Sequence, residues 1–411
     1  MANQFEFVGT LKAIKDSDKF KGYDEKTYDS GWISRRLRFN MVCGTNRHML
    51  SVDGGKFEDE HNVVYTFSKG GYDDEGNKIK GESIQIPFKD RLKPELVETV
   101  AEFRKFVVDT EEPKRRYKLQ NAMEKIKEGK EITAEELEEM GVASEAEIST
   151  EYEKSKKKRH EFISEWDFAE WIKKILDSGK YDDRMFLVKG NIENQFNKEK
   201  MTFYTSYVPT RIYLAEKDAE PKSEATMTVV YDENGLDDLS VEDTGRYYLN
   251  AYTMEYNRDD KTKPLPCPIT LALPKAADDD VKGQKIETKY LKYFKPESGT
   301  VAEIGLRITI LDGAEQKEIT PECLSEEQQE NLELGLVTMD DIRKELGVST
   351  MFGDRITEYR VLGLATGYSK GAAETVYEPE NLVLENVVGA VADNSQVDAI
   401  LEGMEDSDDE I

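Results

Sequence analysis

The sequence predicts a mainly β protein with helical insertions (class α+β), built as two β-barrel units in tandem and ending in a disordered acidic tail. Three observations lead to this prediction. Apolar residues recur at alternate positions in several segments, as in half-buried strands. A polar stretch at 216–224 separates two β-rich regions. The last ten residues contain six Asp or Glu residues, which is typical of an interaction tail.

The composition limits the classes of function. The chain has 57 basic and 85 acidic residues, a net charge of −28. This charge opposes indiscriminate binding to duplex DNA or anionic membranes, so any nucleic-acid site has to be a local basic patch. The three cysteines lie far apart and do not indicate a disulfide framework. No stretch approaches the roughly 18 apolar residues of a membrane span, and the first residues do not resemble a signal peptide. We therefore expect a cytoplasmic protein without membrane contacts.

The first predicted domain covers residues 1–215 and begins with strands at 5–14, 33–43 and 47–52. In the second strand Leu37, Phe39 and Met41 share one parity and are apolar, whereas Arg36 and Arg38 share the other. One face of this strand is therefore expected to be buried and the other to be polar. Gly9 stands where a barrel strand has to bend sharply. Strands at 63–67 and 83–88 predict an additional ribbon.

A helical insertion is predicted at about 90–160. After Pro94, the residues that follow one helical stripe are Leu96, Val97, Val100, Phe103 and Val107. From 110 to 160 the chain is rich in Glu and Lys and has few large apolar residues, so it is not expected to form the core of a domain.

The first domain is predicted to end in a helix and a hairpin. The helix has an apolar face that includes Phe168, Ile172 and Ile175, and Ser178-Gly179 is a C-cap signal. Two strands follow at 185–192 and 201–214. A helix that caps a barrel and a hairpin that closes it are how an OB fold ends, and the hairpin tip is where such folds commonly grip nucleic acid.

The second predicted domain, at 225–388, is β-rich as well. Strands are predicted at 225–231, 246–256, 269–273, 286–294, 301–311, 355–366 and 375–377. A helical stretch begins at Ser325, which forms a capping-box pattern with Gln328. In this domain the predicted strands are followed by this helix and then by a strand, a turn and a further strand. The first domain has the same order, so we predict a second, OB-like barrel. Residues 389–411 form the predicted tail.

The first domain resembles the single-stranded DNA-binding protein family of bacteria and their phages. The similarity lies in residues 7–11 (FVGTL), 37–40 (LRFN) and 168–191 (FAEWIKKILDSGKYDDRMFLVKGN), and in the acidic ending with a terminal hydrophobic residue. The insertion and the second domain fit a larger, phage-type member. The resemblance implies a protein that coats and protects single-stranded DNA in replication or recombination, in the cytoplasm of a bacterial host. It also implies a tail that recruits replication or recombination proteins through Asp406, Asp408, Asp409, Glu410 and Ile411.

Binding of single strands without sequence preference needs cations along the backbone and aromatic faces for the bases. The candidate contact residues on the second and third strands are Trp32, Arg35, Arg36, Arg38, Arg47 and His48. Those on the closing hairpin are Lys189, Phe196, Lys198, Lys200, Phe203, Tyr207 and Arg211. Alternation places Phe203, Tyr207 and Arg211 on the face opposite Ile212 and Leu214. The alternative interpretation is an ordinary polar strand face with an incidental histidine and with aromatic residues that favour strands in any case.

Three further features have both a functional and a structural interpretation. The basic run at 154–159 could contact phosphate or be a solvated helix face. Tyr247, Tyr248, Tyr252 and Tyr256 could stack on bases or pack in a core. The tail could recruit partners or only increase solubility.

The motifs of common catalytic sites are missing from the sequence. It has no phosphate-binding loop, no His-Glu-x-x-His pair and no nucleophile elbow. Cys43 and His48 are close in sequence, but no second pair completes a zinc site. We therefore predict no enzyme activity, no cofactor and no metal. The alternatives that stay open are a virion structural or assembly protein and an accessory factor of a nuclease or polymerase; the sequence does not predict the oligomeric state.

Overall fold

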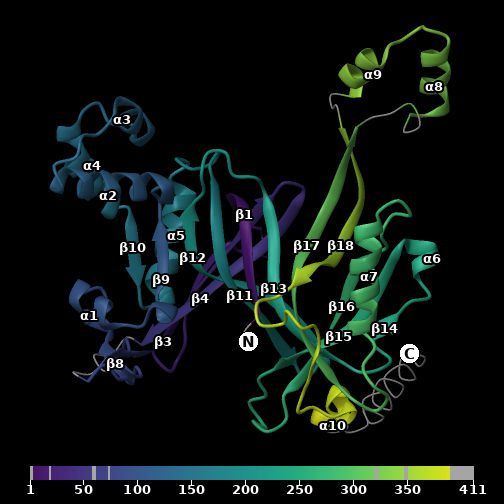
Figure 1. Cartoon of the computed structure of the whole chain (residues 1–411), viewed down its shortest axis with the longest axis horizontal. Helices are drawn as coiled ribbons and strands as arrows, with labels where there is room; N and C mark the ends of the chain where they lie inside the picture. The colour runs from purple at the N-terminus through teal and green to yellow at the C-terminus, as the bar shows by residue number, and fades with distance from the viewer. Residues whose placement is uncertain are drawn as a thin grey trace, which may run out of the picture.

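The structure is a computed structural model of the chain (Figure 1). It describes residues 3–17, 20–57, 62–72, 75–318, 321, 324–346 and 350–388. The predicted tail, from residue 389 to Ile411, lies outside the described residues. In the described ranges, no helix is long and apolar enough to cross a membrane.

Among the described residues, the first half of the chain contains twelve strands, of which four, β5 to β8, lie in the ribbon region. The strands are β1 (Gln4–Ala13), β2 (Tyr23–Thr27), β3 (Trp32–Cys43), β4 (Asn46–Phe57), β5 (Val63–Phe67), β6 (Gly71–Tyr72), β7 (Lys78–Ile79), β8 (Ser83–Pro87), β9 (Phe106–Asp109), β10 (Arg159–Phe162), β11 (Met185–Asn197) and β12 (Thr202–Leu214). The helices are η1 (Phe88–Asp90), α1 (Pro94–Thr99), η2 (Glu102–Arg104), α2 (Pro113–Lys127), α3 (Ala134–Met140), α4 (Glu145–Lys156) and α5 (Glu165–Asp177).

The second half has fewer and longer strands. The strands are β13 (Lys222–Tyr231), β14 (Leu236–Asp237), β15 (Arg246–Glu255), β16 (Leu265–Pro274), β17 (Ala302–Glu318), β18 (Thr350–Leu364) and β19 (Ala373–Glu374). The helices are α6 (Val241–Thr244), α7 (Val281–Tyr293), α8 (Glu326–Glu333), α9 (Met339–Leu346), η4 (Pro379–Leu382) and α10 (Leu384–Val388).

The strands of the first half form a closed ring of pairings. β1 pairs with β3, β3 with β4, β12 with β11, and β11 with β1, all antiparallel. β12 and β4 complete the ring in parallel, with Tyr207 beside Leu50. Gly9 lies where β1 turns from β11 towards β3, and a Cβ there would lie 2.1 Å from the carbonyl oxygen of Val42. This close approach is the physical reason for the glycine.

The second half repeats the same ring. β13 pairs with β15, β15 with β16, β18 with β17, and β17 with β13, all antiparallel. β16 and β18 complete it in parallel, with Leu271 beside Tyr359. In each ring a helix precedes the fourth strand: α5 before β11, and α7 before β17.

The first strands of the two rings pair with each other. β1 and β13 run antiparallel, with Phe5 opposite Ala225, and this pairing joins both rings in one 15-stranded sheet. The largest cluster of buried residues extends through both halves, from Phe5 to Val361. The mainly β class with helical insertions is confirmed. Because the pairing of β1 with β13 joins the two halves in one sheet, the division into two barrels and the domain limits at 215 and 225 stay predictions.

The strand predicted at 286–294 is wrong. Residues 286–293 belong to helix α7, and Phe294 is its C-cap. The side chain of Asp280 caps the start of this helix by accepting a hydrogen bond from the backbone N–H of Gly283 at 2.8 Å. Tyr290 and Phe294 are buried. They are four residues apart, so both lie on one helical face, and the aromatic residues that suggested a strand pack as a helix stripe.

The helix predicted after Pro94 is correct only at its start. α1 ends at Thr99, η2 follows, and Val107 lies in strand β9 beside β12. By contrast, the insertion at α2–α4 is helical as predicted and has a small core that includes Leu119, Met140 and Ile148. The capping box of Ser325 and Gln328 is confirmed at the start of α8.

Candidate nucleic-acid interface

The solvent side of β3 and β4 gathers four of the predicted contact residues: Trp32, Arg36, Arg38 and Arg47, here called the β3–β4 face. The cross-strand register sets Arg36 opposite Asp53, and Arg47 opposite Val42. Arg36 and Arg47 are exposed, and Arg38 and Trp32 are half-buried. The alternation in the sequence predicted these positions because even-numbered residues of β3 point away from Leu37 and Phe39.

The indole of Trp32, the first residue of β3, packs over Gly55 of β4. Its ring meets that of Phe57 at a centroid distance of 4.8 Å and an interplanar angle of 65°. A Cβ on Gly55 would lie 1.9 Å from Cζ2 of Trp32, so only glycine leaves room for the indole. Phe57 was missed from the sequence, because Asp53-Gly54-Gly55 suggested that the strand ended there. Two aromatic rings therefore stand at one end of the β3–β4 face.

Replacement of Gly55 by alanine is expected to displace the Trp32 indole. The added methyl group overlaps the ring, and overpacking of this kind typically costs about 1–3 kcal/mol. Tryptophan emission should shift to longer wavelength as the indole loses its contact with the strand. Gly71→Ala is the matched control, since a Cβ there has nothing within 4 Å. Unchanged emission in Gly55→Ala would contradict this placement of Trp32.

The cations of the β3–β4 face are held to different degrees. Arg36 forms an ion pair with Asp53 that is half-exposed on both sides. Nη1 of Arg38 donates to the carbonyl oxygen of Lys21 at 3.4 Å, and its guanidinium lies 4.9 Å from the ring centre of Phe20. Arg47 extends from an exposed position of β4. Exposed ion pairs contribute little to stability, so a phosphate can replace Asp53 as the partner of Arg36 at low cost.

Arg35 does not belong to this face. It is 8% exposed and shares the parity of the core residues. Its Nε donates to Glu25 at 2.8 Å, and its Nη1 donates to the carbonyl oxygen of Trp166 at 2.8 Å and reaches Glu170 at 3.3 Å. Its guanidinium also stacks on the Trp166 ring at 3.7 Å. Arg35 therefore fastens α5 to the sheet, and the prediction that it contacts DNA is wrong.

His48 lies in the core. Its ring stacks on Phe7 at 4.3 Å, and Nε2 shares a hydrogen bond with the hydroxyl group of Ser223 on β13. Within the described residues, Nδ1 has no hydrogen-bond partner. Burial lowers the pKa of His48 to about 4, and the charge of Asp312 only partly opposes this shift. The predicted contact with DNA is wrong, because His48 and Arg47 are adjacent in a strand and point to opposite sides.

Tyr207 also points inward, against the prediction. Its ring meets those of Phe5, Phe7 and His48 at 5.3–5.6 Å. Burial raises the pKa of Tyr207 well above its ordinary value, and a nearby Tyr359 raises it further.

The cause of this error is a β-bulge. Arg211 pairs with Lys189 but Pro209 pairs with Gly190, so Thr210 is an extra residue. A bulge reverses the alternation, and positions 207 and 211 therefore face opposite sides.

Lys189 and Arg211 face outward, but neither belongs to the β3–β4 face. Nζ of Lys189 lies 2.6 Å from Glu6, which also accepts from Lys222 at 3.0 Å. Partial burial alone would raise the pKa of Glu6, but these two lysines hold it below its ordinary value. Arg211 donates to the backbone oxygen of Glu102 at 3.1 Å. Lys189 therefore lies beside β1, and Arg211 lies beside η2. Their contact with nucleic acid stays a prediction.

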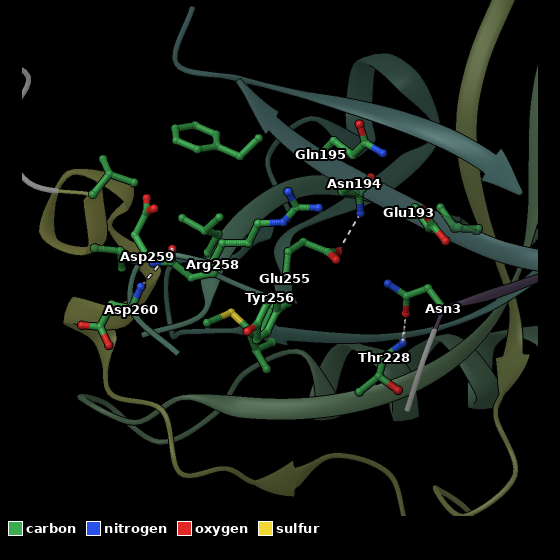
Figure 2. Close-up of a pocket in the computed structure, with 18 of the residues that line it drawn as sticks. Asn3, Glu193, Asn194, Gln195, Thr228, Glu255, Tyr256, Arg258, Asp259 and Asp260 are labelled. Atoms are coloured by element: carbon green, nitrogen blue, oxygen red, sulfur yellow. Dashed lines mark hydrogen bonds between the residues drawn. The ribbon is translucent and has the colours of Figure 1, made fainter. Parts of the chain in front are cut away.

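The tip of the β11–β12 hairpin is bound to the second half. Phe196 and Phe203 form a cross-strand pair at 5.0 Å, and Lys198 forms an ion pair with Asp259. Behind them, Nδ2 of Asn194 donates to Glu255 at 2.7 Å (Figure 2). Lys200 is exposed beyond the end of the pair.

A cavity of about 930 Å³ lies at this junction (Figure 2). Its acidic lining residues are Glu193, Glu255, Asp259, Asp260 and Glu303, and its basic ones are Lys198 and Arg258. This excess of acid disfavours phosphate inside the cavity. The predicted role of the hairpin tip in DNA contact stays a prediction.

Several of the remaining candidates are engaged in structural contacts. Lys154 and Lys156 pair with Glu151 and Glu153 at 2.8 and 2.7 Å, as a solvated helix face does. Tyr252 packs with Leu382, and Tyr247 donates to Glu287 at 2.9 Å. Tyr256 is 64% exposed and lines the cavity.

In the part of the chain that the structure describes, no group of three or more His, Cys, Asp or Glu side chains could hold a metal ion.

The chain has few detectable relatives. No protein-family model matches it, and no curated protein matches its sequence. Among solved structures, one match is the crystal structure of a deletion mutant of the single-stranded DNA-binding protein from Thermus aquaticus. The match has 8% sequence identity and covers 75% of this chain and 86% of that chain. The TM-score is 0.25, which is too low to carry an argument about fold or function.

Proposed function

We propose that the chain is a non-catalytic protein that binds single-stranded DNA through the β3–β4 face of its first half. The observation that carries this proposal is the grouping of three arginines and the Trp32–Phe57 pair on one solvent-exposed strand pair. In a chain of net charge −28, such a face is a local exception. Cations for the phosphates and a π face for the bases are the two requirements of sequence-independent binding.

We further propose that each ring of strands is an OB barrel. The order of pairings supports this: first strand with second and fourth, second with third, fourth with fifth, and third with fifth in parallel. A helix between the third and fourth strands also fits. OB folds bind oligonucleotides on the face of strands two and three, which are β3 and β4 in the first ring.

The second ring is expected to serve the architecture rather than to hold DNA. The outward residues in the middle of β15 are Tyr248, Asn250 and Tyr252, and those opposite them on β16 are uncharged too. Tyr252 lies under a small cluster with Tyr377 and Leu382, so the C-terminal segment covers part of this face. Arg246, at the start of β15, pairs with Glu358 at 3.0 Å.

The biological role we propose is coating and protection of single strands during replication or recombination, for a phage in the cytoplasm of its bacterial host. In this proposal the acidic residues before Ile411 recruit other replication or recombination proteins. The resemblance in sequence to the single-stranded DNA-binding family supports this role.

Titration with oligo-dT of roughly 30 nucleotides at low salt should quench tryptophan fluorescence. Most of the quenching is expected from Trp32, because Trp166 is 6% exposed under Arg35 and Trp171 is stacked on His160 at 3.9 Å. Trp32→Phe should therefore lose most of the quench but still bind a labelled oligonucleotide by anisotropy. Absence of binding at low salt would reject the function, and a full quench in Trp32→Phe would place the site elsewhere. Duplex DNA and RNA of equal length serve as competitors.

A virion assembly role is the second candidate, and one observation favours it. α8 and α9 stand away from the sheet on the long β17–β18 arm (Figure 1). Leu334 and Leu336, between these helices, are 65% and 69% exposed, as in a subunit contact. Concentration-dependent assembly in sedimentation without DNA affinity would favour this role.

A further inference from the structure

Four side chains outside the strand rings form an exposed group, here called the aromatic platform: Tyr65, Phe67, Phe103 and Arg104. Tyr65 and Phe103 are 71% and 72% exposed, far more than is usual for large rings. The rings of Phe67 and Phe103 lie 6.3 Å apart. The guanidinium of Arg104 lies 4.9 Å from the first ring and 5.5 Å from the second, so one cation spans both.

The aromatic platform rests on a small buried cluster and on backbone hydrogen bonds between β5 and the segment before η2. Beneath it, Val97, Val100 and Ile163 belong to a small buried cluster with residues of β8. The backbone N–H of Ala101 donates to the carbonyl oxygen of Phe67 at 2.8 Å, and that of Lys69 donates to Thr99 at 2.7 Å. These bonds fix η2 against β5. Because a separate set of residues fills the core, the exposed rings of Tyr65 and Phe103 are not needed to build it.

The platform continues the β3–β4 face. Nδ2 of Asn62, at the start of β5, lies 3.4 Å from the carbonyl oxygen of Phe57, the ring that touches Trp32. Tyr65 and Phe67 are two residues apart on one strand, so they share a side and stand roughly 7 Å from each other. β5 pairs with β8 in a small separate sheet.

Glu165 lies between the two surfaces. Desolvation raises the pKa of Glu165, although its side chain reaches the surface, and the charge of Arg104 opposes that rise. The backbone next to Glu165 packs on Gly54 of β4, where a Cβ would lie 2.6 Å from the N atom of Trp166. Glu165 therefore stands against the part of β4 that precedes Gly55 and Phe57, and the positive charge of Arg104 acts on its carboxyl group.

The chemistry of the platform suits nucleobases. Flat aromatic rings and a guanidinium plane both stack on bases, and the cations of Lys69 and Arg211 lie beside Glu102 of η2. A protein partner would also use exposed aromatic residues. The cations near the rings and the continuity with the β3–β4 face favour a phosphate-bearing ligand. We propose that the aromatic platform is a second base-stacking site, which extends the path of single-stranded DNA beyond the β3–β4 face.

This inference rests on the proposed function, and oligonucleotide length separates the two. The test measures anisotropy with labelled oligo-dT of roughly 8 and roughly 30 nucleotides, against the full chain and the variant Tyr65→Ala/Phe103→Ala. For the longer strand, affinity should fall about tenfold or more, since stacking on one ring is worth about tenfold per base. For the shorter strand, which the β3–β4 face can hold alone, affinity should stay within twofold.

The control is Tyr117→Ala, because Tyr117 is 65% exposed on α2 of the helical insertion. It should bind both lengths as the wild type does. Equal affinities of the platform variant and the wild type at both lengths would overturn the inference but leave the function standing. An equal loss at both lengths would also overturn it, because the platform would then be part of the primary site. If the wild type binds neither strand, the proposed function itself fails. Phe103→Ala alone provides a milder variant if the double variant unfolds at lower urea.

Discussion

The variant that combines Arg36→Ala, Arg38→Ala and Arg47→Ala is expected to bind single-stranded DNA roughly a hundredfold more weakly than the wild type. Each arginine offers one charge-assisted contact to phosphate, worth about 1 kcal/mol at an exposed site, and tenfold corresponds to about 1.4 kcal/mol. Removal of three phosphate contacts should also lower the slope of log K against log salt by about 2, since each contributes about 0.7 on single strands. Anisotropy titrations across a salt series measure both quantities.

Two comparisons make this result specific. Alanine at Lys114, Lys127 and Lys130 changes the net charge by the same amount on the helical insertion, and is expected to leave affinity nearly unchanged. Asp53→Asn removes the partner of Arg36 and should strengthen binding. All three arginines are at least partly solvent-exposed, so urea unfolding should change by less than about 0.5 kcal/mol per site. Equal weakening by the lysine variant would show that only overall charge matters.

Acid is expected to destabilise the chain through His48. In the unfolded state this histidine takes up a proton below about pH 6.5, whereas in the folded state its pKa is about 4. Between these values the unfolded state binds more protons, so stability falls as the pH falls. The loss is about 2 kcal/mol at pH 5 and about 3 kcal/mol in total. Above pH 6.5 this group has no effect.

The measurement is urea unfolding of the wild type and of His48→Met/Ser223→Ala at pH 7 and pH 5. The double variant removes the histidine together with its hydrogen-bond partner, so no hydroxyl group is left unpaired. Other groups titrate in this range: burial lowers the pKa of His160 as well, whereas desolvation raises that of Glu193. The difference between the two proteins isolates His48. The same acid loss in both would show that His48 is already protonated or exposed in the folded state.

The strands of the first ring could be predicted because one side of each strand is buried and the other side faces solvent. In β3 the alternation around Leu37 and Phe39 identified the face that carries Arg36 and Arg38. The same rule failed for Tyr207, because the extra residue at Thr210 reverses the alternation and no sequence signal beyond Pro209 announces it. The prediction for Arg35 failed for another reason. Its buried charge is balanced by Glu25 on β2 and by groups on α5, which are more than a hundred residues away in the sequence.

The repeat within the chain was detected but misaligned. The sequence suggested that the helix at Ser325 corresponds to α5, whereas the structure sets α7 in that position and β17 in the place of β11. The error comes from segment 286–294. Its aromatic residues suggest a strand unless Asp280 is recognised as the N-cap of a helix. The aromatic platform was also missed, because Phe103 shared a helical stripe with Val97 and Val100, and the chain leaves the helix at Thr99.

The pairing of β1 with β13 determines how the two halves respond to a pull. Five residue pairs, from Gln4 with Thr226 to Val8 with Lys222, join the halves across the junction. A connection made only by the short stretch before Lys222 would act as a hinge, and each half would diffuse on its own tether. With β1 and β13 paired, a rotation between the halves requires the rupture of sheet hydrogen bonds. Single-stranded DNA under tension on the β3–β4 face would therefore pull on one rigid unit. The force would be transmitted to the second half and to the arm that carries α8 and α9.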